Sequence, residues 1–128
     1  MADIATALTA LLNDRDSSVD ETIDRHFAEG YRQKTDGLWS DRAQFTDHIA
    51  HLRAIVAHAE VRVLDELVQG TAYADRHEVH VTKTDGTLVV QEVYLFGTLA
   101  EDGRFAEVHE VTHLLRGNEA DRSLGTAS

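Results

Sequence analysis

Residues 71–115 read TAYADRHEVHVTKTDGTLVVQEVYLFGTLAEDGRFAEVHEVTHLL, and this stretch decides the fold. Two Asp-Gly pairs, at 85–86 and 102–103, interrupt a run that is rich in β-branched residues. Asp-Gly suits the positive backbone angles of tight hairpin turns. The stretch therefore predicts three long antiparallel strands, over about residues 71–83, 87–100 and 104–115. Strands of this length twist and usually bend, and Gly97 is the expected site of a β-bulge.

Three helices are predicted ahead of these strands. The first covers about residues 2–13, where apolar residues recur at helical spacing. Capping boxes that start at Ser18 and Asp41 begin the second and third helices. Gly30 is the expected end of the second helix, and the apolar stripe of the third continues to about Ala59.

The segment between the second and third helices, from Tyr31 to Trp39, reads as extended chain with a turn at Asp36-Gly37. Helices grouped before a run of strands predict an α+β, cone-shaped roll, in which three N-terminal helices pack into the mouth of a long curved antiparallel sheet. We predict one domain over residues 1–117, followed by a polar C-terminal tail over 118–128.

Composition narrows the possible partners. The 128 residues carry a formal net charge of −11, which repels phosphate backbones and argues against nucleic acid as a partner. The sequence has no apolar run of about 18 residues that would span a membrane. It also has no cysteine, which excludes thiolate chemistry and makes the cytoplasm the expected compartment.

Four strings carry a resemblance to a known family. They are FAEGYRQKTDGLWSDRAQFTDHI at 27–49, VYLFG at 93–97, DGRFAEVHEVTHLL at 102–115 and DRSLG at 121–125. With the order of predicted elements, they resemble the nuclear transport factor 2-like superfamily, and within it the SnoaL-like, ketosteroid-isomerase-like branch. This superfamily carries isomerases, cyclases, dehydratases, hydrolases and non-enzymes on one scaffold.

The resemblance implies a homodimer formed through the outer face of the sheet, and one apolar pocket per subunit. Catalytic relatives move protons there without a cofactor. An acid near the end of the final strand in the cyclase branch is replaced here by His113, with His109 at the aromatic position four residues before it. The general-base Asp of ketosteroid isomerases corresponds to Asp36, which Gly37 makes resemble a turn residue.

Alternation places His109 and His113 on one face of the final strand, together with Phe105, Glu107 and Val111. Hydrophobicity alone does not decide which face is concave, and the resemblance favours the His109 face. On that face the two histidines could act as acid and base, because imidazole titrates near neutrality. Alternatively, they are polar residues satisfied at a dimer interface or at the pocket rim.

Glu92 is the further catalytic candidate, on a strand face that it shares with Tyr94 and Phe96. A carboxylate flanked by aromatic rings could have a raised pKa and act as a base. It could equally pair with Arg32 or Arg76. The residues expected to line the pocket are Tyr31, Trp39, Phe45, Tyr94, Phe96 and Val111.

The eight histidines do not predict a metal site. His109 and His113 on one strand lie roughly 13 Å apart, too far to bind one ion. His77 and His80 face opposite sides of their strand. His48 and His51 have helical spacing, but no third ligand is evident.

The sequence thus predicts a cytoplasmic, homodimeric protein that binds a small, largely apolar organic molecule. As an enzyme it would be a cofactor-free isomerase, cyclase or hydratase that uses His109, His113, Glu92 and Asp36. The alternative is a non-catalytic ligand-binding or structural domain of the same fold, with a pocket that is small or filled by side chains.

Overall fold

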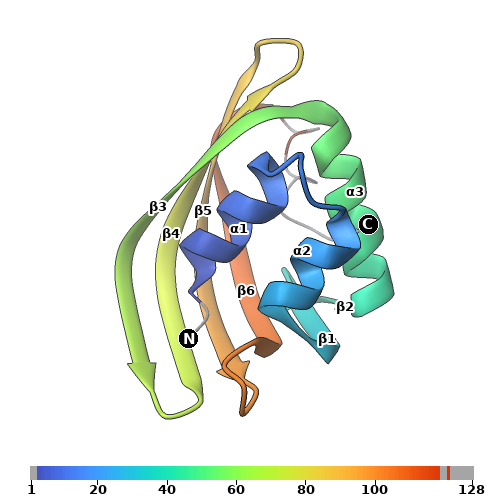
Figure 1. Ribbon diagram of the computed structural model, residues 1–128. Coiled ribbons are helices and arrows are strands. Elements are labelled where there is room, and N and C mark those ends of the chain that lie inside the picture. The colour runs from blue at the N-terminus through green and yellow to red at the C-terminus, as the bar shows by residue number, and fades with distance from the viewer. Residues whose placement is uncertain (1–2, 119–120, 122–128) are drawn as a thin grey trace.

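The computed structural model describes residues 3–118 and 121. Its second and third helices begin directly after Ser18 and Asp41, as predicted, whereas the first begins at Ile4 instead of about residue 2 (Figure 1). They are α1 (Ile4–Asn13), α2 (Val19–His26) and α3 (Arg42–Ile55). The Asp3 side chain caps α1, the Ser18 hydroxyl caps α2, and a full capping box with Asp41 begins α3. Most of the predicted tail, residues 119–120 and 122–128, lies outside the described residues.

Two helices end earlier than predicted. Helix α2 stops at His26 instead of Gly30, because Phe27 already has extended backbone angles and begins a strand. Phe27 is buried among the rings of Tyr31, Phe45 and Phe105. Burial of this side chain therefore overrides the glycine signal. Likewise α3 ends at Ile55, and the chain continues directly into a strand.

Six strands form one sheet in the order β2-β1-β6-β5-β4-β3. The pairing of β1 with β6 is parallel, and the other neighbouring pairs are antiparallel. The three long strands predicted after residue 70 are all present, and a fourth long strand, β3, precedes them. The strands are β1 (Phe27–Thr35), β2 (Leu38–Asp41), β3 (Val56–Gln69), β4 (Ala72–Lys83), β5 (Leu88–Leu99) and β6 (Phe105–Arg116).

A β-bulge in β6 determines which side chains face inward. Thr98 pairs with Glu107 and Leu99 with Phe105, so Ala106 is an extra residue in β6. The predicted bulge at Gly97 is therefore wrong, because Gly97 pairs in register with Val108. Since alternation restarts after the extra residue, Phe105 and Val108 are both buried although an odd number of positions separates them.

All three helices lie against one face of the curved sheet, and no helix of the described residues lies on the other face (Figure 1). This confirms the predicted α+β architecture. The core fills the space between the helices and the concave face, with contributions from α1, α3 and all the long strands. The described part of the chain contains no helix that is long and apolar enough to cross a membrane.

Candidate active site

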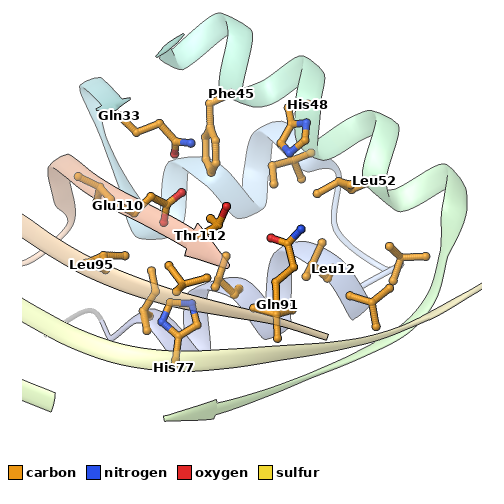
Figure 2. Close-up of a pocket in the computed structure, with 18 of the residues that line it drawn as sticks. Leu12, Gln33, Phe45, His48, Leu52, His77, Gln91, Leu95, Glu110 and Thr112 are labelled. Atoms are coloured by element: carbon orange, nitrogen blue, oxygen red, sulfur yellow. The ribbon is translucent and has the colours of Figure 1, made fainter. Parts of the chain in front are cut away.

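A cavity of about 100 Å³ lies between the helices and the concave face of the sheet. Side chains of α1 and α3 line it on one side, and side chains of β1, β4, β5 and β6 line it on the other. Most of this lining is aliphatic or aromatic. The polar residues among the lining are Tyr31, Gln33, His48, His77, Gln91, Glu110 and Thr112, most of which are drawn in Figure 2.

His77 on β4 is held in place by a buried carboxylate. Its Nδ1 lies 2.9 Å from Oδ1 of Asp75, two residues earlier on the same strand face. Both side chains are almost fully buried, with 1% of His77 and 0% of Asp75 exposed. A carboxylate only accepts, so Nδ1 carries a hydrogen, and in the neutral ring Nε2 is left as an acceptor. The pair therefore has the arrangement of an oriented general base.

Asp75 is in turn supported by Tyr73, the preceding residue on the same face of β4. The Tyr73 hydroxyl accepts a hydrogen bond from the backbone N–H of Ile4, and its one hydrogen is shared between Glu66 on β3 and, more distantly at 3.4 Å, Oδ2 of Asp75. Burial and the hydrogen bond to Glu66 raise the pKa of Tyr73 far above its ordinary value. The hydroxyl is therefore a fixed donor, and it connects the Asp75–His77 pair to α1.

Glu110 on β6 is the only carboxylate among the described residues that line the cavity. Desolvation of the partly buried carboxyl group raises its pKa from 4.5 to about 7, and the nearby carboxylates of Asp36 and Asp75 add to the increase. The hydrogen bond from Thr35 and the charge interaction with His77 oppose it. A carboxyl group with a pKa near neutrality can both donate and accept a proton at physiological pH.

A line of hydrogen bonds ends at Glu110. The Tyr31 hydroxyl donates to Oε1 of Gln33 at 2.7 Å, and Nε2 of Gln33 donates to Oγ1 of Thr35 at 3.0 Å. The Thr35 hydroxyl then donates to Oε1 of Glu110 at 2.9 Å. The parallel pairing of β1 with β6 places Thr35 directly beside Glu110. This register therefore allows Thr35 to donate its hydrogen bond to the Glu110 carboxyl group.

The predicted catalytic residues of β5 and β6 lie outside this cavity. His109, His113 and Glu92 are on the outer face of the sheet, where His109 contacts Glu107 at 3.0 Å and His113 lies 3.7 Å from Glu92. The His113 side chain is 69% exposed. The prediction assumed unbroken alternation from Phe105. The extra residue Ala106 reverses this alternation, so Val108, Glu110 and Thr112 face the cavity.

Most of the predicted pocket-lining aromatic residues are also on the outer face. Tyr94, Phe96 and Val111 are exposed there, and together with His109 they line a second hollow. Trp39 packs edge-on against the ring of His109, with a ring-centroid distance of 5.3 Å. Tyr31 and Phe45, in contrast, do line the cavity.

Asp36 occupies the turn between β1 and β2 instead of the cavity wall. It has a positive φ of 50°, and its carboxylate accepts hydrogen bonds from the backbone N–H and the hydroxyl of Thr112. Its role in the structure is therefore to anchor β6 to the β1–β2 turn. The general-base position expected from the resemblance is filled by a turn residue.

Sequence reasoning missed Asp75, His77 and Glu110. A signal for the first two was present, because Asp75 and His77 are two residues apart on a predicted strand and therefore share a face. Their burial and the inward orientation of Glu110 depend on which face the helices cover. Among the described residues, no three histidine or acidic side chains are grouped in a way that could hold a metal ion.

Comparisons with known proteins support this architecture. The chain is 30% identical over 106 residues to the uncharacterised protein C11D3.04c of Schizosaccharomyces pombe. The aligned region covers 83% of this chain and 81% of the relative. No family model matches the sequence.

Solved structures with the same fold are more distant in sequence. IdmH, a candidate polyketide cyclase from Streptomyces antibioticus, is 17% identical with a TM-score of 0.65, over 84% of this chain and 87% of that one. A candidate isomerase of the SnoaL-like family from Agrobacterium tumefaciens is also 17% identical, with a TM-score of 0.60 over 85% and 93% of the two chains. At this identity the likeness concerns the fold.

Proposed function

Because the chain belongs to the nuclear transport factor 2-like superfamily, in one family with the fission yeast protein C11D3.04c, we propose that it is a cofactor-independent acid–base enzyme of the isomerase or cyclase type. One observation carries the proposal. His77, which is hydrogen-bonded to Asp75, and Glu110, whose pKa is about 7, face the same small apolar cavity.

The two groups take complementary roles in the proposed reaction. His77 Nε2 removes a proton from a carbon next to a carbonyl group, and Glu110 gives its proton to the carbonyl oxygen. The C–H electron pair becomes a C=C bond, so the product of this step is an enol, with His77 protonated and Glu110 ionised. In a β,γ-unsaturated ketone this enol is a conjugated dienol. His77 returns its proton to the γ carbon while the enol O–H returns its proton to Glu110. The C=C bond shifts to the α,β position, the carbonyl re-forms, and both groups are restored.

The size of the cavity limits the substrate. A cavity of about 150 Å³ accommodates benzene, so the smaller cavity of about 100 Å³ here sets an upper limit of about six non-hydrogen atoms. Steroids and polyketides exceed this size many times. The proposal is therefore restricted to small, largely apolar substrates, or to a small reacting end of a larger molecule.

Proton exchange tests this function before the natural substrate is known. Small ketones such as cyclopentanone and 2-cyclopentenone are incubated with the protein in D₂O, and proton NMR follows the loss of the α-protons. We expect catalysed exchange in the wild type. Removing one general acid or base typically lowers a rate about 10²–10⁴-fold, so we expect Glu110→Gln and His77→Gln each to lose it.

The matched control is His113→Gln, which replaces an exposed histidine on the outer face and should leave exchange unchanged. Exchange that persists in both cavity variants, or that is lost in His113→Gln, would contradict the assigned roles. Absence of exchange with every ketone, despite demonstrable binding, would instead favour the second function described next.

The second candidate function is ligand binding without turnover. The small volume of the cavity favours it, because most of the interior is filled by packed side chains. In this case Glu110 and His77 would orient a ligand and no proton would be transferred. Binding of a small ketone with no exchange above the background rate in D₂O would identify this function.

We also propose that two copies associate through the outer face of the sheet. Phe96 and Val111 are 55% and 61% exposed on neighbouring strands of that face, and Tyr94 and Trp39 extend the apolar surface. His109, His113 and Glu92 would then be polar residues of an interface. We place this dimer in the cytoplasm, and the support is the absence of cysteine from the sequence.

A further inference from the structure

The Tyr73 hydroxyl on β4 lies between two carboxylates and has a single hydrogen to donate. Oδ2 of Asp75 lies 3.4 Å from the hydroxyl oxygen, and the carboxylate of Glu66 on β3 approaches the same oxygen more closely. The hydroxyl also accepts a hydrogen bond from the backbone N–H of Ile4, the first residue of α1. Because two acceptors compete for one hydrogen, a stronger hydrogen bond to one carboxylate weakens the hydrogen bond to the other.

The pairing of β3 with β4 creates this competition. Strand β3 contains an extra residue, Leu64, where its register with β4 shifts. After this bulge Glu66 lies directly opposite Asp75, and its side chain reaches the Tyr73 hydroxyl. Glu66 is exposed on the edge strand of the sheet, whereas Tyr73 and Asp75 are buried. A carboxylate that faces solvent therefore contacts the same hydroxyl as a buried one.

The direction of the Tyr73 hydrogen affects the basicity of His77. Nδ1–H of His77 donates to Oδ1 of Asp75, and the negative charge of that carboxylate stabilises the protonated ring. A hydroxyl hydrogen that turns toward Oδ2 brings a partial positive charge to the same carboxylate and weakens this stabilisation. When the hydrogen is directed to Glu66 instead, the full charge of Asp75 acts on the imidazole.

We propose that Glu66 raises the basicity of His77 by holding the Tyr73 hydroxyl hydrogen away from the buried carboxylate. The proposal rests on the proposed function, in which His77 is the general base, and it extends control of that base to the exposed edge of the sheet. Neither Glu66 nor Tyr73 lines the cavity. Both are therefore positioning residues, which act on the reaction only through His77.

Other titratable groups near His77 also influence its protonation, so they must stay in place while Glu66 is varied. Glu110 on β6 interacts with His77 through its charge. Helix α1 carries no titratable side chain over Ile4–Asn13, and the residues paired with His77 on the two neighbouring strands are valines. The titratable groups that share the cavity or the hydrogen bonds of His77 are Tyr31, His48, Glu66, Tyr73, Asp75 and Glu110.

NMR of protein with ¹⁵N-labelled histidine, without any ligand, measures the pKa of His77 and shows which ring nitrogen carries the hydrogen. The variant His77→Gln identifies its signals among the eight histidines. We expect Glu66→Ala to lower the pKa of His77 by about 1, the size expected when one hydrogen bond changes its acceptor. Glu66→Asp keeps the charge but is one methylene group shorter, so we expect a similar decrease.

Two further variants separate the hydrogen bond from a simple effect of charge. Asp65→Ala is the matched control, because it removes the adjacent carboxylate of β3, which pairs with Arg76, and it should leave the pKa of His77 nearly unchanged. Tyr73→Phe removes the hydroxyl and should keep the pKa of His77 at or slightly above its wild-type value. In the Tyr73→Phe background, Glu66→Ala should have no further effect.

Other results would overturn the proposal. A pKa of His77 that is lowered in Glu66→Ala but not in Glu66→Asp, or that is lowered equally in Asp65→Ala, would show an effect of charge alone. An effect of Glu66→Ala that persists in Tyr73→Phe would show that the hydroxyl is not involved. An unchanged pKa in Glu66→Ala, or a His77 that does not titrate, would exclude control of its basicity by Glu66.

The decisive comparison does not depend on a variant in the core. If Tyr73→Phe does not fold, the comparison of Glu66→Asp with Asp65→Ala still decides, because both substitutions are at exposed positions. Because the pKa of His77 is measured in ligand-free protein, absence of the proposed catalysis would leave each of these outcomes unchanged.

Discussion

At the scale of single residues, the interior combines groups with opposite preferences for charge. Asp75 is fully buried as the partner of His77, whereas Glu110 lies nearby with a pKa raised to about 7. Two carboxyl groups separated by one intervening strand, about 10 Å apart across the sheet, disfavour simultaneous ionisation. In the structure, the Asp75 carboxylate is hydrogen-bonded to the imidazole of His77, whereas the pKa of Glu110 is raised to near neutrality.

The raised pKa of Glu110 predicts a specific dependence of stability on pH. The folded state binds this proton more tightly than the unfolded state, where the ordinary value of 4.5 applies. Stability therefore falls as pH rises from about 4.5 to about 7, and the full loss is present above that range. We expect the free energy of unfolding of Glu110→Gln, relative to the wild type, to increase by about 2 kcal/mol from pH 5 to pH 8.

Urea denaturation followed by circular dichroism measures this difference. Glu107→Gln is the control: hydrogen bonds from His109 and Arg32 lower the pKa of Glu107 from 4.5, so this carboxylate is largely ionised in both states from pH 5 to pH 8, and its removal should leave the pH dependence in this range nearly unchanged. An unchanged difference between wild type and Glu110→Gln at the two pH values would contradict the raised pKa.

At the scale of secondary structure elements, β6 is the strand that determines the site. It pairs in parallel with β1 and antiparallel with β5, and its bulge at Ala106 directs Glu110 inward and His109 outward. A β-bulge inserts a single residue, yet it exchanges the faces of every residue that follows. The chemistry of the cavity and of the outer face therefore both depend on this one insertion.

Gly97, opposite the bulged segment, should not tolerate a side chain. A Cβ atom at this position would lie 3.3 Å from the carbonyl oxygen of Glu107 and 3.4 Å from Cγ2 of Val108. We expect Gly97→Ala to lower the free energy of unfolding by about 1–3 kcal/mol. Gly30→Ala is the matched control, since nothing lies within 4 Å of its added Cβ.

Gly30→Ala should leave the free energy of unfolding unchanged or raise it by about 0.5 kcal/mol, because alanine restricts the conformations of the unfolded chain. Thermal and urea denaturation of both variants measure the contrast. Equal effects of the two substitutions would show that the close approach at Gly97 does not constrain the sheet.

At the scale of the whole molecule, the two faces of the sheet differ in what covers them. Helices cover the concave face (Figure 1) and help to enclose the cavity. The outer face presents aromatic and aliphatic side chains to solvent. An exposed apolar surface of this kind marks an interaction site. A second copy of the chain is the partner that we propose for it.

Charge introduced at the centre of the outer face should separate the proposed dimer. We expect wild-type protein to sediment as a dimer and Phe96→Glu as a monomer, because a carboxylate in an apolar interface has no partner there. Ala50→Glu, on the exposed side of α3, is the control and should remain dimeric. A monomeric wild type in sedimentation velocity would contradict the proposed interface.

The sequence by itself determined the local elements and their assembly. Capping residues such as Ser18 and Asp41 act on the backbone within three residues, and the Asp-Gly turns act between adjacent strands, so both can be read without tertiary contacts. The order of helices and strands then left the α+β roll as the architecture. The local errors are the early ends of α2 at His26 and α3 at Ile55 and the predicted bulge at Gly97, and burial of Phe27 explains the first of them.

Only the tertiary structure decided which residues form the site. The alternation of side-chain direction along β6 defines two faces but does not indicate which face the helices cover. The extra residue Ala106 exchanges the two faces for the residues after it, and no local feature of the sequence signals it. The parallel pairing of β1 with β6, 75 positions apart, brings Thr35 to Glu110. The raised pKa of Glu110 follows from the burial of its side chain in the folded protein. Local propensities therefore specify the strands, whereas register and burial, which depend on distant parts of the chain, specify the chemistry.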